Sequence, residues 1–388
     1  MKSTFLQYCL IGLFLLLTVG ITAWSWVLVD PNFTLVNHAD WTKFRAFAIS
    51  IGYFQRQYSA NIYLLLILAF TISSFLIVKW YKGPVLPLLI AVGIIAGLLS
   101  YPALSHDLFN YIFDARIVTH YHANPYLHKA LDFPADHMLR FMHWVHRTYP
   151  YGPTYLLITL IPSALGLGIF SLTFFLFKGM HVVLFVVAGW LLYKTNRKAS
   201  LIFMTSPLII IEGLINSHND FIALALGIIG IYLLKNKRNV FALLIFITSG
   251  LIKFISLPIT LMIVNETTVK KVKNPGWIRH LVKDFHTWHI ALTSILILLA
   301  YLISRQEIQP WYFLNLFIFL LFIPNIFEKF TIAFTGLLLS YYPYVLGGEW
   351  GQGGDVGVKR SIITFSFLLN LVILLMLFVY KRLKLSRS

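Results

Sequence analysis

The chain is a series of apolar stretches, each about as long as a membrane-spanning helix, separated by short polar segments. The clearest are Phe5–Leu28, Asn61–Lys79 and Val85–Tyr101. Because about 20 apolar residues in a helix cross the hydrocarbon core of a bilayer, each predicts a transmembrane helix. Further spans are expected within 154–193, 200–216, 220–234, 239–264, 288–304, 312–326, 330–346 and 361–380. The pattern predicts an all-α polytopic membrane protein of about 11–13 spans, forming a single domain over residues 1–388.

Two regions do not fit a simple up-and-down order. The range 239–264 must form a hairpin, with a break expected near Ser249-Gly250. The range 154–193 must cross an odd number of times, and Lys178 interrupts its apolar pattern. The sequence leaves the path of this second region open.

The charges orient the chain in the membrane. Of its residues 59% are apolar, and the formal net charge is +17. The basic residues gather in short clusters between spans, which is typical of cytoplasmic loops and argues against a nucleic-acid partner. The clusters are Lys79 with Lys82, Lys194–Lys198, Lys235–Arg238, Lys270–Lys283 and Lys381–Arg387. They place the loop 105–150 on the outer side of a multi-pass protein, which we expect in the cell (inner) membrane.

This outer loop is the candidate for chemistry. It holds four of the fourteen acidic residues and seven of the thirteen histidines. Asp107, Tyr111 and Asp114 are spaced i, i+4, i+7, so a helix would align them on one face. That helix is expected to stop near Asn124-Pro125-Tyr126, because a residue before proline avoids helical geometry. Its stripe of Leu108, Ile112 and Ala115 is expected against the membrane.

A second amphipathic segment is expected over Pro134–Arg147, with Met138, Met142 and Val145 toward lipid. These polar groups could simply form a solvated loop with an interfacial helix. Two histidine pairs, His120-x-His122 and His143-x-x-His146, could instead be metal ligands. Neither pair is a specific ligand pattern, so no metal site is predicted, although the sequence leaves open whether a divalent ion helps.

Four motifs in order along the chain carry a resemblance to a known family. They are Asp107-x-x-x-Tyr111 with Asp114-Ala115-Arg116, Asn124-Pro125-Tyr126 and Tyr151-Gly152-Pro153; Ser217-His218-Asn219-Asp220; Leu251-Ile252-Lys253-Phe254; and Gln309-Pro310-Trp311-Tyr312. Together they resemble GT-C-type glycosyltransferases, and most closely the polyprenol-phosphate-dependent mannosyltransferases and their bacterial relatives. Ala115 and Ser217 stand where that group commonly has glycine.

The resemblance implies inverting transfer of a single sugar, most plausibly mannose, from a polyprenyl-phosphate donor to a glycan or lipid acceptor at the outer membrane face. No other cofactor is implied. Asp107 would be the general base, since a carboxylate beside apolar surface can accept a hydroxyl proton. Arg116, His218 and Lys253 would bind the donor phosphate. The sugar or acceptor would contact Tyr111, Asp114, Asn124, Tyr126, Asn219, Asp220, Trp311 and Tyr312.

Several of these residues also have a simpler interpretation. Lys253 could snorkel to the interface, Asn219 or Asp220 could cap a helix, and Trp311 with Tyr312 could belong to an aromatic belt. The alternative function is a carrier or flippase for a lipid-linked sugar, without chemistry. The polar groups gather in one outer loop rather than at mid-membrane, which favours the enzyme.

Overall fold

The computed structural model describes residues 2–263, 287–348 and 353–385. Within these ranges the protein is helical and contains no strand; one isolated bridge pairs Lys129 with Thr148. The predicted all-α class is therefore confirmed. Of the basic clusters, Lys270–Lys283 lies outside the described residues.

Five described helices are long and apolar enough to cross a membrane. They are α1 (Lys2–Ser25, whose apolar run extends to Leu28), α3 (Arg56–Trp80), α7 (Phe170–Thr195), α13 (Thr287–Arg305) and α17 (Gly353–Leu385). The bent pair α8 (Arg197–Thr205) and η5 (Ile209–Ile215) makes a sixth if it counts as one span. The sequence-based count of 11–13 exceeds this number, because several apolar runs are divided into shorter helices that continuous hydropathy does not reveal.

The remaining elements are shorter. They are α2 (Ala39–Gly52), α4 (Val85–Val92), η2 (Gly93–Leu98), α5 (Asp107–Thr119), η3 (Ala130–Asp132), η4 (His137–Arg140), α6 (Pro153–Leu165), α9 (Asn219–Lys235), α10 (Asn239–Ile252), η6 (Phe254–Thr260), η7 (Pro310–Leu321), α14 (Pro324–Lys329), α15 (Thr331–Leu339) and α16 (Tyr342–Gly347), with a single turn η1 (Trp26–Leu28).

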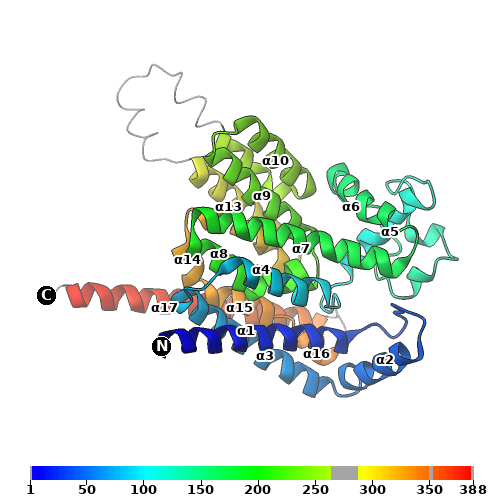
Figure 1. The fold of residues 1–388 in the computed structure, drawn as a ribbon, viewed down its shortest axis with the longest axis horizontal. Helices are drawn as coiled ribbons and strands as arrows, with labels where there is room; N and C mark the ends of the chain where they lie inside the picture. The colour runs from blue at the N-terminus through cyan, green and yellow to red at the C-terminus, as the bar shows by residue number, and fades with distance from the viewer. Residues whose placement is uncertain (1, 264–286, 349–352, 386–388) are drawn as a thin grey trace.

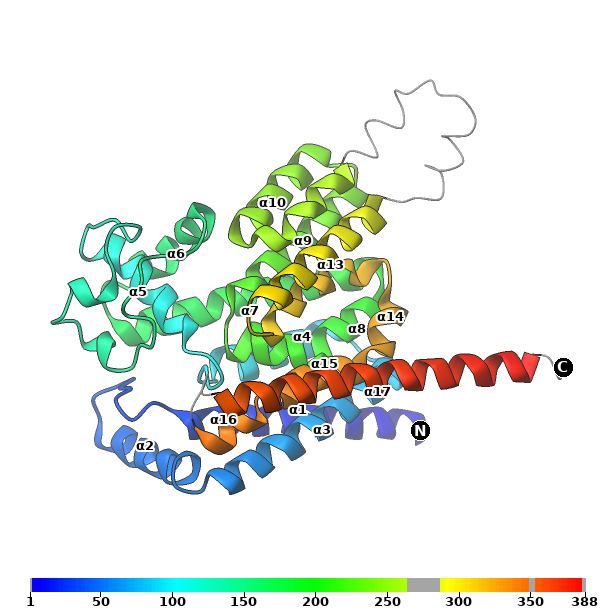
Figure 2. The same ribbon diagram turned by 180° about the vertical axis from the view of Figure 1, so that it is seen from behind.

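The polar loop and the two termini occupy opposite ends of the molecule. Helices α5 and α6 lie at the same end as α2, whereas the N-terminus and the end of α17 lie at the other end (Figures 1 and 2). The basic clusters Lys194–Lys198 and Lys79 with Lys82 come from segments that contact each other. Arg197 of the first cluster donates to the carbonyl oxygen of Gly83, next to Lys82, at 2.6 Å. Arg197 begins α8, which lies away from α5 and α6 in both views (Figures 1 and 2).

The loop 105–150 differs from the prediction in three ways. Helix α5 forms as expected but ends at Thr119, because the chain turns there and His122 adopts a positive φ of 52°. The range 134–147 is not an amphipathic helix; only the short η4 is helical, and turns make up the rest. Of the six residues predicted to face lipid, Val145 is half-buried and the other five are buried inside the protein: Leu108, Ile112, Ala115, Met138 and Met142. An apolar stripe alone cannot distinguish lipid from a packed protein neighbour.

The structure also gives the path of the chain through 239–264 and 154–193, the two regions that did not fit a simple up-and-down order. The hairpin in 239–264 is present, but its break falls at Lys253, whose φ and ψ of −135° and 113° are extended. Ser249 and Ser256 then face each other across the hairpin, with their hydroxyl oxygens 3.0 Å apart. The range 154–193 contains the short helix α6 and one full-length span, α7.

Candidate active site

A cavity of about 660 Å³ opens beside the start of α5 and brings together segments that are far apart in the sequence. Four of the residues predicted from the motifs line it: Asp107, Lys253, Trp311 and Tyr312. Its other lining residues are Leu104, Ser105, His106, His143, Trp144, Arg147, Tyr151, Glu307, Gln309, Tyr344 and Gly348. The cavity is therefore built from the loop, the break after α10 and the segment leading into η7.

Asp107 is the first residue of α5 and projects into this cavity with 14% of its side chain exposed. An acidic side chain is favourable in the first turn of a helix, where the backbone N–H groups are unpaired. The buried Tyr111 donates to its Oδ2 at 3.5 Å, as the i, i+4 spacing predicts. The carboxylate thus remains accessible from the cavity while its orientation is constrained from behind.

His218 lies between two carboxylates at the back of the site. Its Nδ1 is 3.6 Å from Oδ2 of Asp107, and its Nε2 is 3.3 Å from Oε2 of Glu212. The imidazole also stacks on the indole of Trp311, with ring centroids 4.1 Å apart. Because both ring nitrogens face carboxylates, His218 is placed to orient Asp107 rather than to present a free N–H to the cavity.

The local backbone explains how His218 reaches this position. The π-helix η5 carries the fully buried Glu212, and Ser217 after it adopts a positive φ of 57° that turns the chain back. The backbone N–H of His218 then donates to the carbonyl oxygen of Glu212 at 3.0 Å. A buried carboxylate is costly unless it is paired, and Oε2 of Glu212 faces His218 and accepts from the amide of Asn216 at 3.0 Å.

A second polar cluster joins two of the motifs. Nζ of Lys253 is 2.9 Å from Oδ2 of Asp220, while Asn315 donates to the other carboxylate oxygen at 3.0 Å. Lys253 also lies over the ring of Tyr151, 5.4 Å from its centroid. The neighbouring Asn219 is fully buried. Lys253 is therefore neither snorkelling nor isolated, since it connects α9 to the cavity wall.

Eight of the twelve predicted site residues do not line this cavity. Four of them belong to the groups already described behind the cavity wall (Tyr111, His218, Asn219 and Asp220), and the other four are directed elsewhere. Arg116 pairs with Asp136 at 2.7 Å and faces a separate cavity of about 430 Å³. Asn124 stabilises its own turn by accepting from the backbone N–H of Tyr126 at 3.0 Å. Tyr126 in turn donates to the carbonyl oxygen of Tyr151 at 3.1 Å. The fourth, Asp114, lies on α5 beyond the cavity edge.

Burial perturbs the pKa values of three groups of the loop. It raises the pKa of Asp114 to about 7, with a smaller contribution from the charge of Asp107 and an opposing one from Arg147. Burial also lowers the pKa of His106 to about 3, so that this imidazole is neutral near pH 7. The nearby His143 has a lowered pKa for the same reason.

The main cation missed by the motif analysis is Arg147. It lines the cavity, and its guanidinium lies over the indole of Trp144 at 4.7 Å from the ring centroid. Arg147 ends the segment that was expected to be amphipathic, and the sequence gave no reason to select it over Arg140. Glu307 and Gln309 were also missed; both accept from Lys359, at 2.7 and 2.8 Å.

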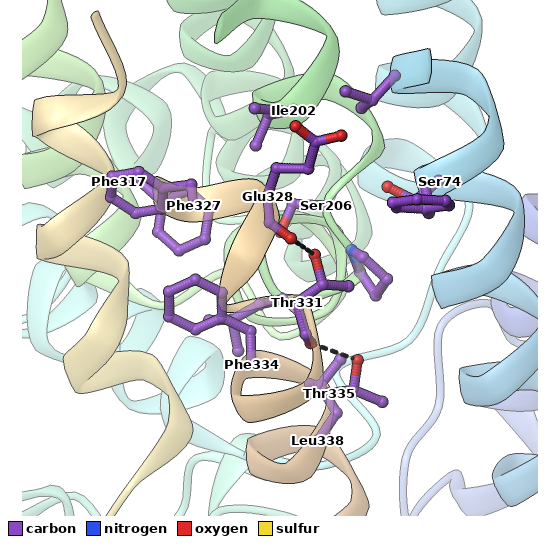
Figure 3. Close-up of a pocket in the computed structure, with 14 residues that line it drawn as sticks. Ser74, Ile202, Ser206, Phe317, Phe327, Glu328, Thr331, Phe334, Thr335 and Leu338 are labelled. Carbon is purple, nitrogen blue, oxygen red and sulfur yellow. Dashed lines mark hydrogen bonds between the residues drawn. The ribbon is translucent and has the colours of Figure 1, made fainter. Parts of the chain in front are cut away.

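A smaller cavity of about 40 Å³ lies between α3, α8, η7, α14 and α15 (Figure 3). Phenylalanine rings line much of it, and its threonine hydroxyls are used internally, with Thr331 donating to the Glu328 carbonyl at 2.7 Å and Thr335 to the Thr331 carbonyl at 2.8 Å. None of the predicted site residues lines it. It is a packing void rather than a site for chemistry.

Comparison with known protein families gives a match over more than half of the chain. Residues 10–269 match the family model described as the MptA/B family, alpha-(1->6)-mannopyranosyltransferase, N-terminal domain. No curated protein and no solved structure gives a significant match. The matched range includes the cavity residues Asp107, Arg147 and Lys253, whereas Trp311 and Tyr312 lie beyond it.

Proposed function

The chain belongs to the MptA/B family of alpha-(1->6)-mannopyranosyltransferases, a GT-C-type family that uses a polyprenyl-phosphate-mannose donor, and on this basis we propose how its cavity performs the transfer. Asp107 is the general base, and the acceptor is a hydroxyl group of a glycan. The supporting observation is that the Asp107 carboxylate is exposed to the cavity and held from behind by Tyr111 and His218.

In this mechanism the acceptor oxygen attacks the anomeric carbon of mannose as Asp107 removes its proton. The bond between that carbon and the phosphate oxygen breaks, and its electron pair leaves with the polyprenyl phosphate. Displacement from the opposite face inverts the anomeric configuration and needs no nucleophile from the protein. Lys253 and Arg147, the cations on the cavity wall, are placed to stabilise the charge of the departing phosphate.

The acceptor and the sugar are expected against the aromatic wall of the cavity. Trp311 and Tyr312 line it, and their rings meet edge to face at 5.8 Å between centroids. An indole face suits the apolar face of a pyranose, while Gln309 and Glu307 offer hydrogen-bond acceptors for its hydroxyl groups. Asp220 and Asn219 lie behind Lys253 and support this wall rather than contacting the sugar directly.

The test is mannose transfer by purified protein in nanodiscs, with a short-chain polyprenyl-phosphate mannose and an α-mannan oligosaccharide. Asp107→Asn is expected to lower kcat by about 10²–10⁴-fold, the usual contribution of a general base. Asp132→Asn is the matched control, because Asp132 lies in the same loop but outside the cavity. Transfer by Asp107→Asn at the wild-type rate would refute the role of this carboxylate.

We also propose that the cavity opens on the outer side of the membrane. The supporting observation is that basic segments and the loop 105–150 lie apart in the fold (Figure 1). The single cysteine, Cys9, can be replaced by serine to give a background for labelling. In intact cells, His128→Cys should then react with a membrane-impermeant maleimide and Lys194→Cys should not; the opposite pattern would reverse the orientation.

A further inference from the structure

Three potential metal ligands meet beside Asp107, although they come from distant parts of the chain. Asp30 follows the first span, His106 directly precedes α5, and His143 lies in the loop after η4. One ligand atom from each lies within 4.8 Å of the others. Sequence spacing did not predict this group, because its members come from three segments. His143 belongs to one of the two histidine pairs seen in the sequence, but its ligand partners here are Asp30 and His106 rather than His146.

The surroundings of His106 prepare one of its nitrogens for coordination. Its Nδ1 is 3.3 Å from the carbonyl oxygen of Phe141. A carbonyl can only accept, so Nδ1 carries the hydrogen and Nε2 keeps a free lone pair. Metal-bound histidines commonly make such a second bond, which fixes the ring and its tautomer. The rings of Tyr101 and Phe109 pack edge to face against the same imidazole and restrict its rotation further.

His143 is the adjustable member of the group. Its ring lies against that of His106, with centroids 3.9 Å apart and a tilt of 33°, and its side chain is exposed. Metal–ligand bonds of about 2.0–2.1 Å at a tetrahedral angle require ligand atoms about 3.3 Å apart. The present separation of up to 4.8 Å is larger, so the cluster has to contract, and rotation of the exposed His143 can supply that movement.

The ligand types select the class of metal. Two imidazole nitrogens and one carboxylate oxygen suit Zn²⁺ and similar borderline cations, whereas Mg²⁺ and Ca²⁺ prefer oxygen ligands alone. Three protein ligands leave one position of a tetrahedral site open, as in catalytic rather than structural zinc sites. His106 and His143 both line the cavity that contains Asp107, so the open position is accessible from it.

We propose that Asp30, His106 and His143 bind a single Zn²⁺-like divalent cation whose remaining position faces the active-site cavity. Binding of the donor phosphate rests on the function proposed above: the remaining coordination position of the cation binds an oxygen of that phosphate. The cation would add to the positive charge of Lys253 and Arg147 on the leaving-group side. The cation would also join Asp30, which follows the first span, to His106, which directly precedes the general base Asp107.

The first test needs no sugar substrate and therefore does not depend on mannose transfer. Full-length protein in detergent is stripped with a chelator, titrated with Zn²⁺ alone, and analysed by calorimetry and by metal content after dialysis. Wild type is expected to hold one Zn²⁺ per chain. His143→Ala and Asp30→Asn should weaken binding at least 10-fold, whereas His146→Ala, a change at an exposed histidine of the same loop, should not. Undiminished binding by His143→Ala, or none by wild type, would overturn the site.

The second test concerns the open position. Co²⁺ in place of Zn²⁺ gives visible absorption that reports its coordination, and this absorption should be lost in His106→Ala. Because His106 is buried, His143→Ala provides the same readout at an exposed residue. Addition of a short-chain polyprenyl phosphate should change the Co²⁺ spectrum of wild type. An unchanged spectrum, with binding of that lipid shown separately, would overturn the phosphate contact while leaving the metal site intact.

Discussion

The pair formed by Lys253 and Asp220 offers a quantitative test of the site, because removal of one partner leaves the other charge nearly buried. The two side chains are 2.9 Å apart, with 21% of Lys253 and 2% of Asp220 exposed. Breaking a buried pair from one side costs about 3–5 kcal/mol. Asn315 still donates to Asp220 in a Lys253→Met variant, and Lys253 is partly hydrated, so we expect about 2–4 kcal/mol of destabilisation.

Lys253→Met preserves much of the aliphatic stem while removing the ammonium group, which lies over the ring of Tyr151. Asp220→Asn should destabilise the protein by a similar amount. The double variant should recover most of the loss, because neither charge then remains unpaired. A double-mutant cycle is expected to give a coupling energy of about 2 kcal/mol, measured from unfolding in mixed detergent micelles.

Kinetics of the same variants separate stability from chemistry. The double variant regains stability but still lacks one of the two cations of the cavity wall. Its kcat/KM for the donor should therefore remain about 10–100-fold below wild type, equivalent to about 1.4–2.7 kcal/mol. Two results would refute the reasoning. One is additive destabilisation with coupling below about 0.5 kcal/mol. The other is full activity of the double variant, which would show that Lys253 serves only the pair.

Three further predictions concern residues around the cavity. Because burial raises the pKa of Asp114 to about 7, folding favours its protonated form, and the free energy of unfolding should fall as pH rises from about 4 to about 7. Asp114→Asn should remove this pH dependence in thermal unfolding, whereas an unchanged dependence would assign it to other groups. Glu212→Gln should lower kcat by about 10–100-fold with little change in donor KM, because His218 loses the charge that orients it. Equal changes in kcat and KM would contradict a positioning role for Glu212. Gly152→Ala should lower the free energy of unfolding by about 1–3 kcal/mol, because a Cβ at this position would overlap the Leu251 carbonyl. Gly179→Ala is the control: it has open space around it and should be neutral or stabilising.

The parts of the site that could be predicted are those set by local spacing and by short motifs. The i, i+4 relation of Asp107 and Tyr111 survives in α5 as a direct contact. Lys253 was conspicuous as a charge inside an apolar run, and such a charge needs a partner. The sequence could not name that partner, Asp220, since the pairing depends on how α9 packs against the broken hairpin.

The failures have a common physical origin. Arg116 was expected at the donor phosphate, yet it pairs with Asp136, which comes from a turn that was predicted to be helical. Periodicity assigned 134–147 to a helix because Met138 and Met142 are spaced i, i+4, although both are buried by protein contacts of an irregular loop. Tertiary packing can bury an apolar pair in any backbone conformation, so the spacing alone did not decide the structure.

The most puzzling residue of the sequence, Lys178, indicates how the base is held in place. Its ammonium group is fully buried in α7 and donates to the carbonyl oxygens of Leu214 and Ile215, both at 2.8 Å, at the end of η5. These carbonyls lack helical partners because the chain reverses at Ser217, which occupies a left-handed conformation that favours glycine.

A lysine at a helix C-terminus satisfies those carbonyls and complements the negative end of the helix dipole. Its hydroxyl partners, Ser100 at 2.9 Å and Ser217 at 3.4 Å, complete its coordination and connect η5 to the segment that precedes the polar loop. The strained turn at Ser217 is therefore stabilised from α7, and that turn sets the position of His218 behind Asp107. Lys178, an unexpected charge in a membrane span, thus supports the geometry of the general base through Ser217 and His218.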